Sequence, residues 1–132
     1  MNKELDLAQV REGIAGYCRA VHTQEAEDFV PLMAEGTENV LISPRNCFVG
    51  TEAILHDFLQ GGIRKAYSQI DLIADSIDLR VAGEDTIVAV FAYHTECIRR
   101  DDGSQYGIAG LETQVWVRQH GAWKLTHVHY SA

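Results

Sequence analysis

Residues 113–131, TQVWVRQHGAWKLTHVHYS, decide the fold class of this chain. Apolar and polar side chains alternate along the stretch, and a tight turn at His120 and Gly121 divides it into two predicted strands. Residues two apart in a strand share a face, so His127 and His129 should project from one surface, with Leu125 behind them. We interpret that surface as the wall of a pocket.

The turns in this part of the chain predict how its strands pair. We treat Asp102-Gly103 and His120-Gly121 as the central residues of two-residue hairpin loops. The pairs next to these loops are then Asp101 with Ser104 and Gln119 with Ala122. Counting outward gives the predicted rows on one face: Tyr93 with Glu112 and His129, Phe91 with Gln114 and His127, and Ala89 with Trp116 and Leu125. A one-residue bulge in either hairpin would invert part of this pattern.

The opposite face of the same strands is also largely apolar. It carries Val90, Ala92, His94, Thr113, Val115, Val117, Thr126, Val128 and Tyr130. A sheet that is apolar on both faces must be covered on both. We assign the tryptophan-bearing face to helices and the valine-bearing face to a second copy of the chain, so we expect a homodimer or a higher oligomer.

Length and charge limit the classes of partner. The chain has 132 residues, which predicts one domain over residues 1–132, and its formal net charge is −8. Such a charge disfavours nucleic acid and anionic membranes as partners. The first residues, MNKELDLA, lack the apolar run of a signal peptide, so we expect a cytoplasmic location. The three cysteines show no Cys-x-x-Cys spacing and indicate neither a disulfide framework nor a thiolate zinc site.

Helical periodicity precedes the strands. One apolar stripe predicts a first helix through Leu7, Val10, Ile14, Tyr17, Cys18 and Val21. Thr23 is expected to cap a short second helix, which Pro31 ends irregularly. A third helix is expected to open at Gly50 and to stop at Gly61 and Gly62.

The remaining elements are extended. Residues 38–42 predict a short strand, and from Ile70 onward the chain is strand after strand, separated by turns that contain glycine. Helices followed by an antiparallel meander predict an α+β fold, with the helices packed on one face of a curved sheet.

Several motifs together resemble a known family. Residues 81–85, VAGED, precede a long strand and an Asp-Gly turn, followed by ETQVW at 112–116, a Gly-x-Trp turn at 121–123 and His-x-His at 127–129. This set resembles the association domain of calcium/calmodulin-dependent protein kinase II. That domain belongs to the nuclear transport factor 2-like superfamily, as do the SnoaL-like proteins. The resemblance covers roughly residues 50–131 at motif level and the helical half in outline.

The resemblance implies a cone-shaped α+β barrel, in which a curved antiparallel sheet wraps around N-terminal helices and encloses a deep pocket. It also implies assembly through the outer face of the sheet, but no kinase activity, because the chain has no Gly-rich loop, His-Arg-Asp or Asp-Phe-Gly motif. The kinase-type pocket carries arginines where this chain has Tyr93, Gln114 and Tyr130. The first functional hypothesis is therefore a stand-alone, non-enzymatic oligomerising domain whose pocket binds an uncharged or weakly polar small molecule, without a cofactor.

The second hypothesis is acid–base catalysis in the pocket. In the row of Tyr93, Glu112 and His129, the histidine or the carboxylate could act as base and the tyrosine as proton donor. Isomerases and dehydratases of the superfamily that the chain resembles use pocket Asp, His and Tyr in such roles. The predicted ligand-binding residues are Phe91, Tyr93, Gln114, Trp116, His127 and His129. A cross-strand pair between Glu112 and His129 that only stabilises the sheet explains the same residues without chemistry.

A metal site is a third possibility. Glu112, His127 and His129 would supply one oxygen and two nitrogens from one face, as in three-ligand zinc sites. Two tryptophans share that face, and the resemblance brings no metal with it, so we expect none. Trp116 and Trp123 are expected in the core rather than stacked on a ligand.

Overall fold

A computed structural model describes residues 2–132. Its helical elements are α1 (Lys3–Thr23), α2 (Ala26–Phe29), the 3₁₀ turn η1 (Val30–Leu32), α3 (Thr51–Ala53), the π-helix η2 (Ile54–Ile63) and α4 (Arg64–Ala66). Its strands are β1 (Val40–Ile42), β2 (Cys47–Val49), β3 (Tyr67–Gly83), β4 (Thr86–Arg99), β5 (Gln105–Tyr106), β6 (Ala109–Gln119) and β7 (Ala122–Tyr130).

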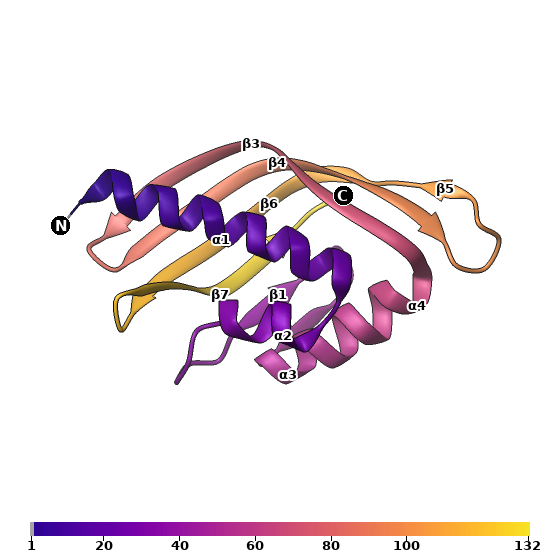
Figure 1. The fold of residues 1–132 in the computed structure, drawn as a ribbon, viewed down its shortest axis with the longest axis horizontal. Helices are drawn as coiled ribbons and strands as arrows, with labels where there is room; N and C mark the ends of the chain where they lie inside the picture. The colour runs from indigo at the N-terminus through magenta and orange to yellow at the C-terminus, as the bar shows by residue number, and fades with distance from the viewer. Residues whose placement is uncertain (1) are drawn as a thin grey trace.

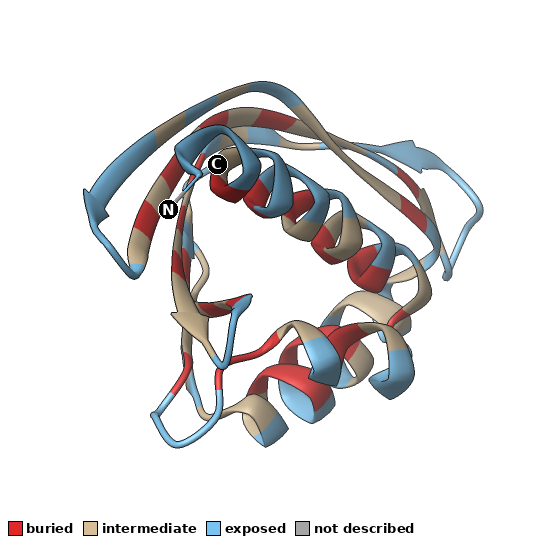
Figure 2. Ribbon diagram, turned by 60° about the vertical axis from the view of Figure 1, so that its left-hand side comes forward, coloured by how far each residue is buried: buried red, intermediate tan, exposed pale blue. Residues whose placement is uncertain are grey.

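The strands form one curved sheet in the order β2-β1-β7-β6-β4-β3, with β5 paired to β4. Every pair is antiparallel except β1 with β7. The sheet arches over α1 while the shorter helices lie below it, and buried residues occur on the strands and helices that border the space between these layers (Figures 1 and 2). The predicted α+β fold, a curved sheet around an N-terminal helix, is confirmed, although the sheet does not close into a complete barrel.

The first helix forms where its apolar stripe predicts it. Asn2 Oδ1 accepts a hydrogen bond from the Leu5 N–H at 3.1 Å, which satisfies one of the unpaired donors at the helix start. The buried stripe includes Val10, Ile14, Tyr17 and Val21. No helix within residues 2–132 has the length and apolarity to span a membrane.

The two shorter helical predictions need correction. The Thr23 hydroxyl accepts the Glu25 N–H and donates to Asp28, so it braces the turn, while α2 itself has no side-chain cap. The third helix continues through Gly61 and Gly62 to Ala66 instead of stopping there. A π-helix pairs residues five apart, and a Cβ at Gly61 would lie 2.7 Å from the His56 carbonyl oxygen. Gly61 therefore permits this wider turn and does not end the helix.

The register of the β4–β6 pair differs from the prediction by two residues. Arg99, and not Asp101, pairs with Ser104, because the loop between them has four residues. Phe91 consequently lies opposite Glu112. A shift of two preserves the side-chain alternation, so the predicted inner face of both strands is retained. The other hairpin pairs Gln119 with Ala122, as predicted.

A bulge in β7 overturns the prediction for the two histidines. Trp116 pairs with Leu125, but Val115 pairs with His127, which leaves Thr126 as an extra residue. Beyond the bulge, Val128 turns inward and is 1 % exposed. Leu125 and Val128 are three residues apart and pair with the inward-facing Trp116 and Gln114, whereas a regular strand would place them on opposite faces.

The packing of α1 on the sheet depends on a glycine. A Cβ at Gly13 would lie 2.6 Å from two ring carbons of Trp116, whose side chain is fully buried. A Cβ at Gly16, one turn along the same helix, would lie 3.1 Å from a methyl group of the flexible Leu32 side chain. Of these two glycines of α1, only Gly13 is therefore held at a distance that admits no side chain.

We expect Gly13→Ala to be less stable than Gly16→Ala by about 1–3 kcal/mol, the usual cost of overpacking a filled core. Both substitutions gain the same helix propensity, so their difference isolates the clash with Trp116. Urea unfolding of the two variants measures it. Equal midpoints would show that the indole moves away from α1 at no cost.

Candidate functional site

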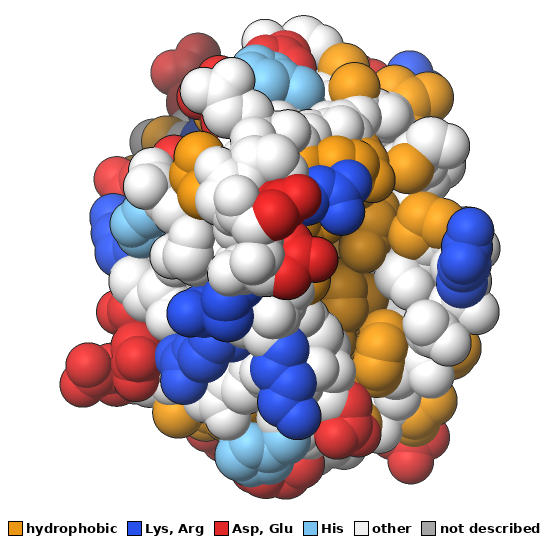
Figure 3. All heavy atoms as spheres, turned by 90° about the vertical axis from the view of Figure 1, so that its right-hand side faces the viewer, with side chains coloured by type: hydrophobic (Ala, Val, Ile, Leu, Met, Phe, Trp, Pro, Cys, Tyr) orange, Lys and Arg blue, Asp and Glu red, His pale blue; other side chains and the backbone are white. Residues whose placement is uncertain are grey.

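A cavity lies between the sheet and the helices. Its volume is about 90 Å³, and a single water needs roughly 10–15 Å³ by the same measure. It is lined by Tyr17, Val21, Phe58, Ile63, Tyr67, Ile70, Leu72, Tyr93, Thr95, Cys97, Ile108, Glu112 and Tyr130. Figure 3, which looks at the side that carries α4 and β5, shows a hollow with apolar side chains at depth. The cavity admits a small organic molecule.

Glu112 is the one carboxyl group among these lining residues. It points inward from β6 and is 3 % exposed. Its Oε2 accepts a hydrogen bond from Gln114 Nε2 at 2.7 Å, and Oε1 has no hydrogen-bond partner within residues 2–132. Burial raises the pKa of Glu112 to about 7, although the hydrogen bond from Gln114 acts in the opposite direction. The carboxyl group can therefore both take up and release a proton near neutral pH.

Three tyrosines surround this carboxyl group. Tyr93 Oη donates to the Ser131 carbonyl oxygen at 2.5 Å, whereas the hydroxyls of Tyr17 and Tyr130 have no such partner within the part of the chain that the structure describes. Burial raises the pKa of Tyr93 to about 12 and raises the pKa values of Tyr17 and Tyr130 above the ordinary range. All three remain neutral phenols, and Tyr17 and Tyr130 can each donate a hydrogen bond to a ligand.

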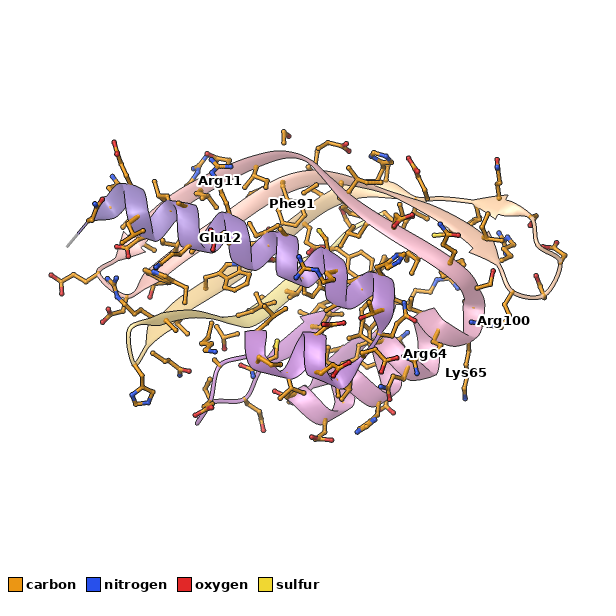
Figure 4. All side chains as sticks on the ribbon, viewed as in Figure 1. Arg11, Glu12, Arg64, Lys65, Phe91 and Arg100 are labelled. Atoms are coloured by element: carbon orange, nitrogen blue, oxygen red, sulfur yellow. The ribbon has the colours of Figure 1, made fainter. Side chains whose placement is uncertain are left out.

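The cavity wall carries no cationic side chain among the residues that line it. Two arginines near its open side, Arg64 and Arg100, are committed elsewhere (Figure 4). Arg64 donates to the carbonyl oxygens of Thr23 and Gln24, and Arg100 donates to those of Arg64 and Tyr67. An anionic ligand would lose its hydration without gaining a counter-ion, so the cavity favours neutral molecules.

The structure brings together only part of the site predicted from the sequence. Glu112 and Tyr93 line the cavity, and Phe91, Gln114 and Trp116 are buried beside or behind it. His127 and His129 lie on the outer face, and His129 is exposed. The predicted row of Tyr93, Glu112 and His129 is wrong, because the β7 bulge places Tyr130 opposite Glu112.

The three residues considered as possible metal ligands are separated in the same way. Glu112 points into the cavity while His127 and His129 point away from it, so the three cannot share an ion. No group of three or more potential ligands gathers anywhere in residues 2–132.

Sequence reasoning missed two of the most important lining residues. Tyr130 was assigned to the outer face, and nothing in the alternation of β7 signals the bulge that turns it inward. Tyr17 was recognised only as part of an apolar stripe. Its position at the centre of a stripe that faces the sheet was the available signal, since a polar-tipped residue there must aim its hydroxyl into the pocket.

Comparison with known proteins agrees with this architecture. The family model of the SnoaL-like domain matches residues 3–129. None of the curated proteins compared with the chain matches it significantly.

Solved structures match over nearly the whole chain. A nuclear transport factor 2-like superfamily protein from Salmonella enterica serovar Typhimurium has 28% sequence identity and a TM-score of 0.88, with 95% of this chain and 89% of that one covered. A proposed dehydratase of the same superfamily from Streptomyces avermitilis has 18% identity and a TM-score of 0.84, with 98% and 97% covered. A proposed calcium/calmodulin-dependent protein kinase II association domain from Xanthomonas campestris has 17% identity and a TM-score of 0.78, with 100% and 89% covered.

The sequence resemblance to this superfamily is thus confirmed by a family match over almost every residue and by the fold. The chain belongs to the SnoaL-like domain family and has the nuclear transport factor 2-like fold.

Proposed function

We propose that this domain is a small acid–base enzyme of the isomerase or dehydratase type, which acts on a neutral organic substrate in the cavity. One observation carries the proposal. Glu112 is a buried carboxyl group with a pKa of about 7, one oxygen fixed by Gln114 and the other open to an apolar cavity. Catalytic acids and bases are expected to have pKa values near the working pH.

The surrounding groups suit proton transfer next to a carbonyl. The Glu112 carboxylate takes a proton from a carbon beside the carbonyl, and the hydroxyl of Tyr17 or Tyr130 donates a hydrogen bond to the oxygen on which charge develops. The protonated Glu112 then returns the proton to another carbon, which gives an isomer, or to a leaving hydroxyl, which departs as water. In both outcomes the carboxylate is restored.

The wall chemistry supports a neutral substrate. Apolar and phenolic side chains dominate it, and the protein's net charge of −8 repels anions. The fold is shared with the proposed dehydratase from Streptomyces avermitilis, which is consistent with this chemistry but does not by itself assign it.

Self-association through the outer sheet face is a second part of the proposal. All helices lie on the concave side of the sheet (Figure 1), so nothing in the described residues, 2–132, covers the convex side. That side carries half-buried apolar residues, which are Val88, Val90, Val115 and Val117. An uncovered apolar face of this kind is typical of a subunit interface. A domain that only binds a small molecule and oligomerises, without turnover, would use the same cavity and the same outer face.

A proton-exchange assay separates the enzyme from the simple binder. The protein is incubated in deuterium oxide with a panel of small cyclic ketones and enones, and deuterium incorporation beside the carbonyl is followed by NMR. We expect incorporation with the wild type and none above background with Glu112→Gln, which keeps the shape of the side chain but cannot accept the proton. If the compounds change NMR chemical shifts in both proteins and no deuterium is incorporated, the result would contradict catalysis and favour binding alone.

A further inference from the structure

Resting on the proposed role of Glu112, we infer that Trp116 and Gln114 are positioning residues, forming a hydrogen-bonded relay that fixes which oxygen of Glu112 faces the substrate and how firmly it holds a proton. The relay occupies alternate inward positions of a single strand, β6. Neither Gln114 nor Trp116 lines the cavity, so neither touches the substrate directly.

The geometry of the relay has a direction. Trp116 Nε1 donates to Gln114 Oε1 at 3.0 Å, and Gln114 Nε2 donates to Glu112 Oε2 at 2.7 Å. An indole N–H can only donate, so it selects the oxygen end of the Gln114 amide. The nitrogen end must then face Glu112.

The packing around Trp116 keeps this direction fixed. Its ring is fully buried and lies against α1 at Gly13, where no side chain intervenes. Gln114 is also fully buried, so water cannot replace either hydrogen bond. A reversal of the amide would leave the indole N–H and one amide group unpaired in the core, which is costly.

The relay has two consequences for Glu112. The hydrogen bond from Gln114 occupies Oε2, so Oε1 is the oxygen available to a ligand. The same bond stabilises the carboxylate and opposes the effect of burial on its pKa. A reversed amide would instead present its oxygen, which accepts a hydrogen bond from the O–H of neutral Glu112 and favours the protonated form.

The test is the titration of Glu112 in ligand-free Trp116→Phe. Phenylalanine keeps an aromatic ring but has no N–H, so the Gln114 amide is free to reverse. We expect the pKa of Glu112 to rise by about 1 to 2, a 10- to 100-fold smaller acid dissociation constant, because the reversed amide accepts a hydrogen bond from the protonated form and no longer donates one to the charged form. NMR of the side-chain carboxyl in protein with isotope-labelled glutamate measures it, and Glu112→Gln assigns the signal.

A matched control is available in Trp123→Phe. Trp123 is also buried, and its Nε1 donates to a carboxylate, that of Asp6, at 3.2 Å. The control therefore loses the same atoms and one donor, but it should leave the titration of Glu112 unchanged. Gln114→Met, which fills similar space without an amide, should raise the pKa of Glu112 as Trp116→Phe does.

The outcomes separate the relay from the enzyme proposal. A Glu112 titration that is the same in Trp116→Phe, Trp123→Phe and the wild type would overturn the relay, whatever the activity. If Trp116→Phe alters the titration while the wild type exchanges no substrate proton, the relay stands and the catalytic role of Glu112 falls. Should Trp116→Phe fail to fold, the pKa of Glu112 in Gln114→Met decides. A higher pKa than in the wild type supports the relay, and an equal pKa overturns it.

Discussion

The Glu112→Gln variant is expected to be more stable than the wild type by about 3 kcal/mol near pH 8, while losing proton transfer about 100- to 10,000-fold. The stability figure follows from the pKa of Glu112, which burial raises from its ordinary value of 4.5 to about 7 in the folded protein. Above about pH 7 the folded protein must hold a charged carboxylate in an apolar cavity. Glutamine removes the charge and retains the side-chain volume.

The size of this effect depends on pH. Below about pH 4.5 the carboxyl group is protonated in both the folded and the unfolded chain, so its ionisation does not lower the free energy of unfolding. Between about 4.5 and 7 the folded protein binds the proton more tightly, so wild-type stability falls as the pH rises. Urea unfolding of both proteins from about pH 4 to pH 8 checks the prediction. A stability difference that does not vary with pH would contradict it.

The second large effect distinguishes the two faces of the sheet. Val128→Asp is expected to destabilise the folded chain by at least about 3–5 kcal/mol, because it buries a carboxylate with no partner. Val128 is 1 % exposed and belongs to the hydrophobic core. Since a domain is typically stable by roughly 5–15 kcal/mol, this variant should be largely unfolded or poorly expressed.

Val115→Asp is the matched substitution on the outer face. Val115 is half-buried and neighbours Val88 and His127 in the sheet. Its replacement should leave the fold intact and shift the particle mass toward that of the monomer, as measured by sedimentation with circular dichroism as the check on folding. An unchanged oligomer with Val115→Asp would show that the outer face is not the interface, and a folded Val128→Asp would contradict the inward orientation after the bulge.

The inner face of β4 and β6 could be predicted from the sequence because alternation survives an error in loop length. The loop between β4 and β5 was predicted two residues too short, yet Tyr93, Glu112 and Trp116 still face inward, since a shift of two preserves each side chain's face. The stripe of α1 and the Gln119–Ala122 pair were predictable for similar reasons. The spacing of residues close together in the sequence determines both the α1 stripe and this hairpin pair.

The bulge and the π-helix could not be predicted because tertiary packing decides them. Nothing in the alternation of β7 marks Thr126 as the extra residue, and the bulge is what lets both Leu125 and Val128 face inward. The two histidines were therefore assigned to the wrong face, and the site was predicted around His129 instead of Tyr130. At Gly61 the usual meaning of glycine, a helix end, gave way to a close approach of the His56 carbonyl.

The catalytic proposal rests on the protonation state of a single buried carboxyl group, and the titration of Glu112 in the ligand-free wild type tests it most directly. NMR of the labelled carboxyl carbon, assigned with Glu112→Gln, reports the midpoint. We expect a midpoint near 7, with the protonated and charged forms both populated at neutral pH. A midpoint near the ordinary value of 4.5 would mean that water reaches the carboxylate freely, and it would contradict the assignment of Glu112 as the acid–base group.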